Sequence, residues 1–238
     1  KGGVGKTTTA INMAAGLAKA EQKTLLVDMD PQCNATSGMG KTPTERHPLI
    51  EPDSINEAMQ KTQANHLQLL PGSRSFLDVD RLANSHGDLT RKVEDHLKQL
   101  ASDFDFVILD CPPSLGALTQ NALACSNEIL MPIQCEYFAM EGLTQMISLI
   151  KEIIQSKNSN LEFGGILLTM FDETLELTSE VESQVRDFFG GVVFDTVIPR
   201  DVAVSEAPSH GHSVLDYSPR SRGSRAYTEL CMEVMQHE

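Results

Sequence analysis

Short apolar segments alternate with segments of helical spacing along most of this chain. The apolar segments predict strands at residues 24–28, 66–70, 104–110, 128–133 and 163–169. Apolar residues recurring every three or four positions predict helices at residues 8–20, 54–61, 87–101, 115–124, 140–155 and 177–189. Because strands that alternate with helices form parallel βαβ units, we expect an α/β fold: a doubly wound, mostly parallel sheet with helices on both faces.

Two segments carry more specific expectations. Segment 104–110 is apolar on both of its faces, which is usual for a strand in the middle of a parallel sheet, so we expect it at a central position. Segment 40–52 is rich in proline and charge, which predicts a surface loop near the ligand that could move when the ligand changes. Ligands of such sheets bind at the carboxyl ends of the strands.

The first eight residues, KGGVGKTT, have the composition of a phosphate-binding loop. Their glycines allow positive φ and let backbone N–H groups approach a polyphosphate. Lys6 can then reach the β- and γ-phosphates, the Thr7 hydroxyl can bind Mg²⁺, and the following helix points its amino end at the phosphates. The pattern G-x-x-x-x-G-K-[ST] is matched from its variable positions onward, with its first glycine falling before residue 1. We expect a buried strand upstream of that glycine, and a gap in the sheet without it.

Length and composition favour one domain over residues 1–238. No run approaches eighteen apolar residues and no signal peptide is visible, so we expect a cytoplasmic protein. An odd number of cysteines without C-x-x-C spacing argues against a disulfide framework or a zinc site and favours reduced thiols, at Cys33, Cys111, Cys125, Cys135 and Cys231. The chain has 19 basic and 33 acidic residues, a net charge of −14, so its overall field repels nucleic acid.

Several segments spread over residues 1 to about 225 together resemble one family. They are KGGVGKTTTAINMAAGLA, DMDPQCNATSGMG, FDFVILDCPPSLGALTQNAL, EYFAMEGL, GILLTMFDE, TVIPRDVAVSEAPSHG and YSPRSRG. The chain resembles the ParA/Soj family of chromosome- and plasmid-partitioning ATPases, in the deviant Walker A group that also contains MinD and the nitrogenase iron protein. The resemblance implies a Mg²⁺-dependent ATPase that hydrolyses ATP to ADP and phosphate, forms an ATP-dependent homodimer, acts in DNA segregation and is stimulated by a ParB/Spo0J-like protein.

The resemblance also implies roles for individual residues. ATP would contact Gly2, Gly3, Val4, Gly5, Lys6, Thr7, Thr8, Pro199 and Arg200. Pro199 can equally be a proline that ends a strand. The residues that would act in catalysis are Lys1, Lys6 and Asp30. Lys1 would cross the dimer interface to touch the partner's phosphates, with a solvated lysine as the alternative.

The carboxylates that end two predicted strands receive separate roles. Asp110 resembles the Walker B carboxylate that holds Mg²⁺ through a water, and its alternative is an ordinary turn or helix-cap residue. Asp30 resembles the carboxylate that orients the attacking water, and it is a further metal candidate beside Thr7. Asp28 resembles a residue that supports the Mg²⁺ site from behind or holds the local structure.

Non-specific DNA binding by the ATP dimer is the family property that this sequence supports least directly. Ala203 and Thr174 stand where the family often has basic residues. The remaining DNA-binding candidates are Arg200, Arg220, Arg222 and Arg225. On an acidic protein these arginines can instead pair with carboxylates, although dimerisation would double their number. We expect association with the nucleoid if these arginines contact DNA, and none through them if they pair with carboxylates.

Two other functions stay open on the sequence. One is a positioning ATPase of the same fold for another cargo, such as a chemosensory array or a microcompartment. The other is a non-hydrolytic or electron-transfer regulator, whose iron–sulfur cluster would bridge two subunits through Cys111 and Cys135. Segment 228–238 is acidic and lacks the lysines of a membrane-binding helix, so we expect no membrane attachment.

Overall fold

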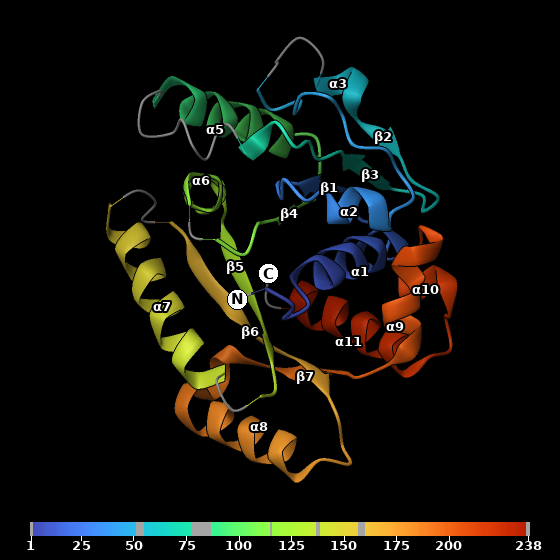
Figure 1. Cartoon of the computed structure of the whole chain (residues 1–238), viewed down its shortest axis with the longest axis vertical. Coiled ribbons are helices and arrows are strands. Elements are labelled where there is room, and N and C mark those ends of the chain that lie inside the picture. Colours follow the sequence, from blue (N-terminus) through green and yellow to red (C-terminus); the bar gives the residue numbers. More distant parts are fainter. Residues whose placement is uncertain are drawn as a thin grey trace.

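The computed structural model describes residues 2–50, 55–77, 87–114, 116–136, 139–156 and 160–236 of the chain. Within them the strands form two sheets, ordered β2-β3-β1-β4 and β5-β6-β7 (Figure 1). All neighbouring strands are parallel except β2 and β3. The strands are β1 (Thr24–Asp28), β2 (Gln60–Lys61), β3 (Leu67–Leu70), β4 (Phe106–Asp110), β5 (Glu128–Gln134), β6 (Glu162–Phe171) and β7 (Val193–Pro199).

Helices cover both faces of the strands. In Figure 1, α5 to α8 lie on one side of the strands, and α1, α9, α10 and α11 lie on the other. Five of the six predicted helices begin and end within two residues of an observed one, and the predicted α/β fold is confirmed. The helices are α1 (Lys6–Lys19), α2 (Asn34–Gly38), α3 (Ile55–Ala58), α5 (Gly87–Ala101), α6 (Ala117–Cys125), α7 (Ala139–Ser156), α8 (Glu176–Phe189), α9 (Val202–Glu206), α10 (Val214–Tyr217) and α11 (Arg222–Gln236), with 3₁₀ turns η2 (Gly190–Val192) and η3 (Ala207–His210).

The sequence missed two strands at sheet edges. We expected one helix over residues 54–61, but α3 ends at Ala58, and Gln60 and Lys61 pair antiparallel with β3. Pairing with a neighbouring strand satisfies these backbone groups and overrides the helical spacing of the side chains. Strand β7 was not predicted either. It ends at Pro199, as one of the two interpretations of that proline required.

Strand β4 lies at the edge of its sheet and not at the predicted centre. It pairs with β1 on one side, and no strand among the described residues pairs with its other side. The side chains of Phe106, Val107, Ile108 and Leu109 are accordingly only half-buried. The position of a strand in a sheet depends on which strands are present to pair with it as well as on its composition. The apolar composition of segment 104–110 alone therefore did not determine its position. The strand expected upstream of residue 1 stays a prediction.

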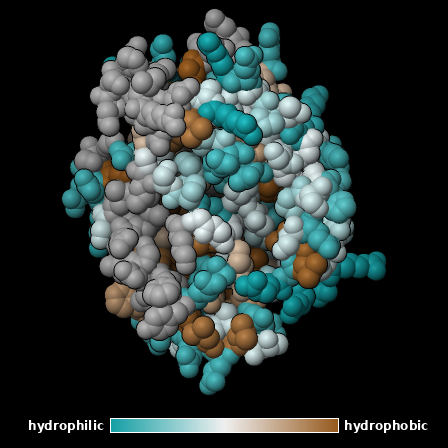
Figure 2. All heavy atoms as spheres, in the orientation of Figure 1, coloured by the Kyte–Doolittle hydropathy of each residue, from teal (hydrophilic) through white to brown (hydrophobic). Residues whose placement is uncertain are grey.

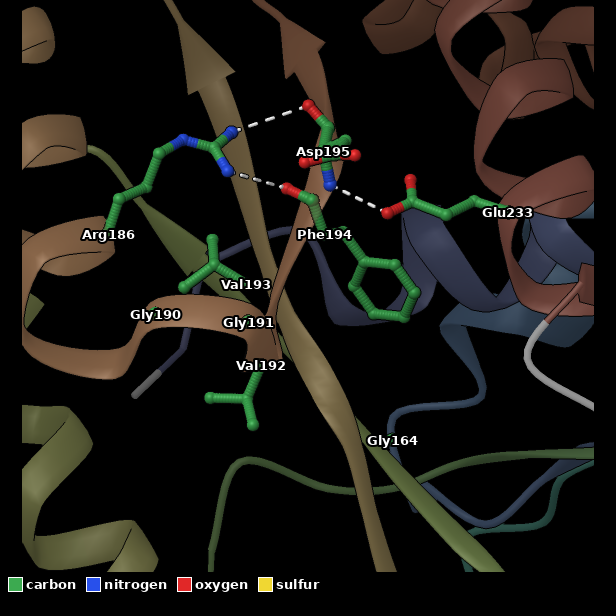
Figure 3. Close-up of a pocket in the computed structure, with 9 residues that line it drawn as sticks. All are labelled: Gly164, Arg186, Gly190, Gly191, Val192, Val193, Phe194, Asp195 and Glu233. Atoms are coloured by element: carbon green, nitrogen blue, oxygen red, sulfur yellow. Dashed lines mark hydrogen bonds between the residues drawn. The ribbon is translucent and has the colours of Figure 1, made fainter.

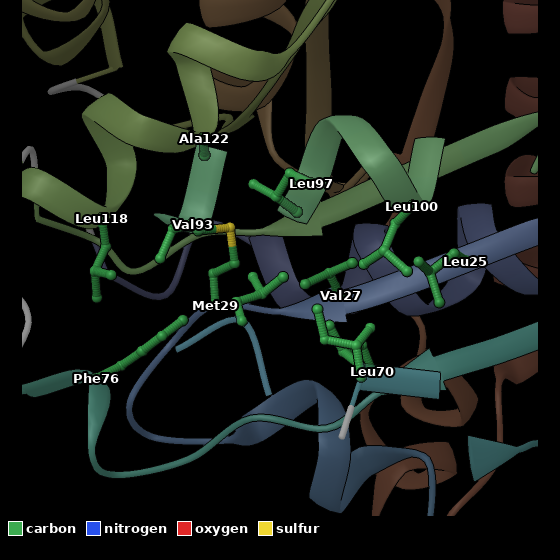
Figure 4. Close-up of a cluster of buried hydrophobic side chains, with 12 residues drawn as sticks. Leu25, Val27, Met29, Leu70, Phe76, Val93, Leu97, Leu100, Leu118 and Ala122 are labelled. Atoms are coloured by element: carbon green, nitrogen blue, oxygen red, sulfur yellow. The ribbon is translucent and has the colours of Figure 1, made fainter. Parts of the chain in front are cut away.

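Strand β1 is buried along its whole length and places its last residue at the functional end of the sheet. Leu25 and Val27 pack with α5 and α6, whereas Leu26 faces α1 on the other side of the sheet. Figure 4 shows Val27, Met29 and Leu70 beneath the side chains of helix α5. Burial on both faces is typical of a parallel strand between two helical layers. In the register with β4, Asp28 lies opposite Asp110.

Strand β7 ends the second sheet, and two charged side chains occupy its free backbone groups. The Arg186 guanidinium donates to Phe194 O at 3.1 Å and to Asp195 O at 3.3 Å. The Glu233 carboxylate accepts from Asp195 N at 2.6 Å and from Thr196 N at 3.0 Å. The residues that make these contacts line a pocket of about 400 Å³ (Figure 3). They satisfy backbone groups that the irregular register between β6 and β7 leaves unpaired.

His47 joins the loop after α2 to the core. We expected a surface loop over residues 40–52, but His47, Pro48 and Leu49 are buried, and residues 51 and 52 lie outside the described residues. The His47 ring stacks on Phe76 with ring centroids 3.5 Å apart. Its Nδ1 accepts from Leu49 N at 3.2 Å, so its Nε2 carries the proton and donates to Asp28 O at 3.0 Å. Burial lowers the pKa of His47 to about 3 despite the contact with Asp28 O.

This pKa predicts a pH dependence of stability. In the unfolded chain His47 has an ordinary pKa of about 6.5, so below that pH the unfolded state binds a proton that the folded state does not. Stability from the neutral ring is therefore complete above pH 6.5 and is lost as the pH falls towards 3. Relative to the variant His47→Gln, the free energy of unfolding of the wild type should fall by about 1.4 kcal/mol more per pH unit between pH 6 and 4.

Urea unfolding of both proteins at several pH values measures this difference. All other titrating groups are shared by the two proteins, so they largely cancel in the comparison. Parallel pH profiles would contradict a buried neutral imidazole.

Candidate nucleotide-binding site

The glycine loop opens directly into helix α1. Gly3 and Gly5 have φ of 78° and 88°, a backbone conformation that a side chain would strain. A Cβ at Gly2 or Gly3 would meet no atom within 4 Å, so this side of the loop is open. Among the described residues no side chain caps the amino end of α1, and its first turn contains no acidic residue. The N–H groups of this turn and the helix dipole therefore make an anion-binding end.

Thr169 of β6 fixes the loop to the sheet. Its Oγ1 lies 3.0 Å from Val4 O and 2.9 Å from Ile133 O, so one hydroxyl ties the loop to the ends of β5 and β6. Thr169 is 2% exposed and lies against Gly5 of the loop. A threonine at a strand end gives no sequence signal for this role, because the loop that it holds lies 165 residues away.

Lys6 lies among carboxylates at the same end of the sheet. It is the first residue of α1, and its ammonium interacts with the charges of Asp110 and Asp30. Burial lowers the pKa of Lys6, and these two negative charges oppose that shift. The three side chains come from the loop, from the end of β4 and from the turn after β1, so the fold brings together the predicted phosphate and carboxylate residues.

Asp110, the last residue of β4, is almost completely buried. It is 1% exposed, and neither of its oxygens has a hydrogen-bond partner of ordinary geometry among the described residues. Burial and the negative charge of Asp28 raise the pKa of Asp110 to about 7, and the nearby Thr7 hydroxyl and Lys6 ammonium offset only part of that shift. A buried carboxylate of this kind is costly unless a cation neutralises it. Carboxylate and hydroxyl oxygens suit Mg²⁺, so Thr7 and Asp110 fit such an ion.

Asp28 differs from Asp110 because its oxygens already have protein donors. Oδ1 accepts from Asp30 N at 3.2 Å, and Oδ2 accepts from Thr36 N at 2.8 Å and from Thr36 Oγ1 at 2.6 Å. Gly72 N donates to the same Thr36 hydroxyl at 2.8 Å, and a Cβ at Gly72 would lie 2.8 Å from Asp28 Cγ. Burial raises the pKa of Asp28 although Thr36 opposes the shift. Asp28 therefore holds the ends of β1, α2 and β3 together.

Asp30 begins the turn that leads into α2. It is 7% exposed, and its Oδ1 accepts from Gln32 N at 2.9 Å. Cys33 N donates to Asp30 O at 2.8 Å, and Cys33 has a φ of 56°, so this turn is tight. Burial and the charges of Asp28 and Asp30 raise the pKa of the Cys33 thiol to about 11, which keeps the thiol protonated and unreactive at neutral pH.

The predicted base and DNA residues gather where β6 and β7 end. Arg200 N donates to Phe171 O at 2.7 Å, directly after Pro199. Arg222 is exposed, with its guanidinium 3.4 Å from Arg200 O and 3.8 Å from the Glu173 carboxylate. The Arg225 guanidinium donates to Arg220 O at 3.0 Å. Lys1 lies outside the described residues.

Asp201 is a residue that the sequence analysis missed in this region. Its carboxylate accepts from Ala203 N at 2.9 Å and from Gly223 N at 2.8 Å, so it joins the first turns of α9 and α11. The available signal was an aspartate placed just before a helix, where it caps free N–H groups. Asp201 thereby sets the position of Arg222, the first residue of α11.

The cysteines give no support to an iron–sulfur cluster. Cys135 is 5% exposed and packs in the apolar cluster between β5, β6 and α8. No group of three or more His, Cys, Asp or Glu side chains placed to hold a metal ion occurs in the described part of the chain. Among the same residues, none of the helices combines the length and apolar character needed to cross a bilayer.

Comparison with known proteins gives consistent matches over this architecture. Residues 1–163 match a family model described as an AAA domain. The chain is 43% identical to the chromosome partitioning protein ParA of Myxococcus xanthus, covering 100% of this chain and 86% of the relative. It is also 43% identical to the chromosome-partitioning ATPase Soj of Treponema pallidum, covering 99% of this chain and 94% of that protein.

A solved structure matches the whole chain as well. Cobyrinic acid a,c-diamide synthase of Mycobacterium smegmatis, crystallised with an ATP analogue and magnesium, superposes with a TM-score of 0.85 at 30% identity. The match covers 100% of this chain and 91% of that one.

The site predicts a specific loss on removal of Lys6. The variant Lys6→Ala should bind ATP about a hundredfold more weakly, because a charge-assisted contact with phosphate is lost at a partly buried position. Lys19→Ala is the matched control, since Lys19 ends the same helix and pairs with Asp216 at 2.7 Å. Calorimetric titration with ATP and Mg²⁺ measures both affinities. Equal affinity in the wild type and Lys6→Ala would contradict the phosphate-binding role.

Proposed function

Since this chain belongs to the ParA/Soj family of chromosome-partitioning ATPases, we propose that residues 1–238 form one domain that works as an ATP-dependent dimerising switch in DNA segregation. The protein is a Mg²⁺-dependent ATP hydrolase. The observation that carries the site assignment is the buried carboxylate of Asp110, which accepts no hydrogen bond of ordinary geometry from the described residues and interacts with the charge of Lys6 at the amino end of α1. Relatives named for chromosome partitioning favour DNA over another cargo.

Each residue of the site has a distinct task in the proposed reaction. The loop from Gly2 to Gly5 and the first turn of α1 bind the phosphates, and Lys6 neutralises negative charge that gathers on the γ-phosphoryl group and the leaving oxygen. Thr7 and Asp110 would hold Mg²⁺, which supplies further charge neutralisation when bound. Asp30 orients a water molecule for in-line attack. A bond forms from that water to the γ-phosphorus, the bond to the ADP oxygen breaks, and the products are ADP and phosphate.

Dimerisation supplies the remaining charge in this proposal. Lys1 of one protomer reaches the phosphates of its partner, as the family resemblance implies. ATP therefore joins two protomers, and hydrolysis lets them separate. Because of this coupling, the oligomeric state depends on which nucleotide is bound.

Removal of Asp30 should separate binding from hydrolysis. In Asp30→Ala the phosphate loop is intact, so ATP should still bind and dimers should persist, while hydrolysis falls at least about a hundredfold for lack of an oriented water. Phosphate release and light scattering measure the two properties. Asp103→Ala, which removes an exposed carboxylate just before β4, is the control. A monomeric Asp30→Ala protein in saturating ATP would count against the switch.

DNA is the proposed target of the ATP dimer. Arg200 and Arg222 meet at one end of the sheet, and Arg220 and Arg225, which flank Arg222 in sequence, are exposed as well. The Arg222–Glu173 ion pair is solvated: the two side chains are 64% and 72% exposed, a setting in which an ion pair contributes little. A ParB/Spo0J-like protein is the proposed stimulating partner, in line with the family.

Charge reversal tests this arginine surface. Arg222→Glu should weaken ATP-dependent DNA retention and lower the slope of log affinity against log salt by about 2, because each of two protomers loses a phosphate contact worth about 0.9. Arg91→Glu makes the same charge change at an exposed residue of α5, a helix on the other side of the molecule (Figure 1). This variant should leave the slope unchanged. Equal slopes for both variants would remove the arginines from the interface.

A further inference from the structure

We propose that His47 is a positioning residue for ATP hydrolysis: its imidazole holds the main-chain carbonyl of Asp28 and thereby fixes where Asp30 presents its carboxylate. The inference rests on the proposed role of Asp30. His47 is fully buried and lies 19 residues from Asp28 in sequence, in a segment expected to be a mobile surface loop.

The backbone from Asp28 to Asp30 is held at each step. Asp28 O accepts from His47 Nε2 at 3.0 Å, and Met29 N donates to Asp110 O at 2.9 Å. Asp30 N donates to the Asp28 carboxylate at 3.2 Å, and Asp30 O accepts from Cys33 N at 2.8 Å. Met29 itself is buried in the same apolar cluster as Phe76 (Figure 4). Loss of the imidazole would leave Asp28 O buried without that donor, at the start of this chain of contacts.

The imidazole is itself held rigidly. Its ring stacks on Phe76, at an interplanar angle of 10°. His47 N donates to Ser75 Oγ at 3.0 Å, Ser73 Oγ donates to Glu45 O at 2.9 Å, and Thr44 N donates to Gly72 O at 3.0 Å. These bonds bind segment 44–47 along the loop after β3, the same loop whose Gly72 packs against the Asp28 side chain. The two segments therefore hold Asp28 from its carbonyl and from its carboxylate.

The substitutions His47→Gln and His47→Asn test the two ring nitrogens of His47 separately. The Gln amide nitrogen lies near the place of Nε2 and keeps a donor for Asp28 O. The Asn amide is shorter: it can replace Nδ1 as the acceptor for Leu49 N, but it does not reach Asp28 O. Ser75→Ala is the matched control, because it removes a hydrogen bond from the same segment and leaves the imidazole contact in place.

The experiment measures kcat and KM for ATP, and the thermal midpoint, in the full-length protein and each variant. We expect His47→Asn to lower kcat about tenfold with KM within about twofold, since a displaced catalytic group loses rate more than binding. His47→Gln should stay within about threefold of the wild-type kcat, and Ser75→Ala should change only the thermal midpoint.

Wild-type kcat in folded His47→Asn, with a lowered thermal midpoint like that of Ser75→Ala, would overturn the proposal and leave His47 as a core residue. If His47→Asn does not fold, His47→Gln decides alone: near wild-type kcat supports the proposal, and a tenfold loss in folded protein overturns it. Asp30→Ala is measured in parallel. Normal turnover in that variant would refute the role of Asp30 itself, a failure distinct from that of His47.

Discussion

The pairing of β1 with β4 places Asp28 directly opposite Asp110, and the remainder of the site depends on how the fold treats these two buried carboxylates. Negative charges this close and this buried repel each other, and each needs either donors or a cation. The protein gives its donors to Asp28, through Thr36 and the backbone of Asp30. From the described residues Asp110 receives none of ordinary geometry, and it interacts with the charge of Lys6. The asymmetry makes Asp28 part of the framework and leaves Asp110 available for the Mg²⁺ ion that we propose it holds.

Sequence reasoning recovered what local spacing encodes. The strands before Asp28 and Asp110 and most helices follow from apolar periodicity, and the structure has them at the expected residues. The glycine loop follows from glycine placement, and Gly3 and Gly5 have the expected positive φ. Sequence reasoning failed where contacts between segments far apart in the chain determine the structure. The edge position of β4 depends on which strands are present to pair with it. The burial of His47 depends on Phe76 and Ser75, which lie 29 and 28 positions further along the chain. Thr169 supports a loop at the opposite end of the sequence.

Helix α1 connects the nucleotide end to the arginine surface through close packing with α11. A methyl group at Gly16 would collide with the Cys231 sulfur, so the two helices approach as near as a glycine permits. Thr9 Oγ1 lies 3.3 Å from Tyr227 OH, and Asn12 Oδ1 accepts from Val214 N at 2.8 Å. Since Asp201 holds the start of α11, the phosphate loop and Arg222 are parts of one tightly packed unit. A change in how two protomers meet would therefore reposition the arginines as a set.

The hydrogen bonds from Arg186 and Glu233 to β7 affect how copies of such a protein could join. A molecule that already pairs through its nucleotide face would grow into an open-ended fibre if a bare strand margin offered a second, unrelated contact. Arg186 and Glu233 already bind amides and carbonyls at residues 194–196, so these groups are not open to pairing with an added strand. This margin of the second sheet is thereby made unsuitable for strand addition, so that contacts between copies are steered to other surfaces.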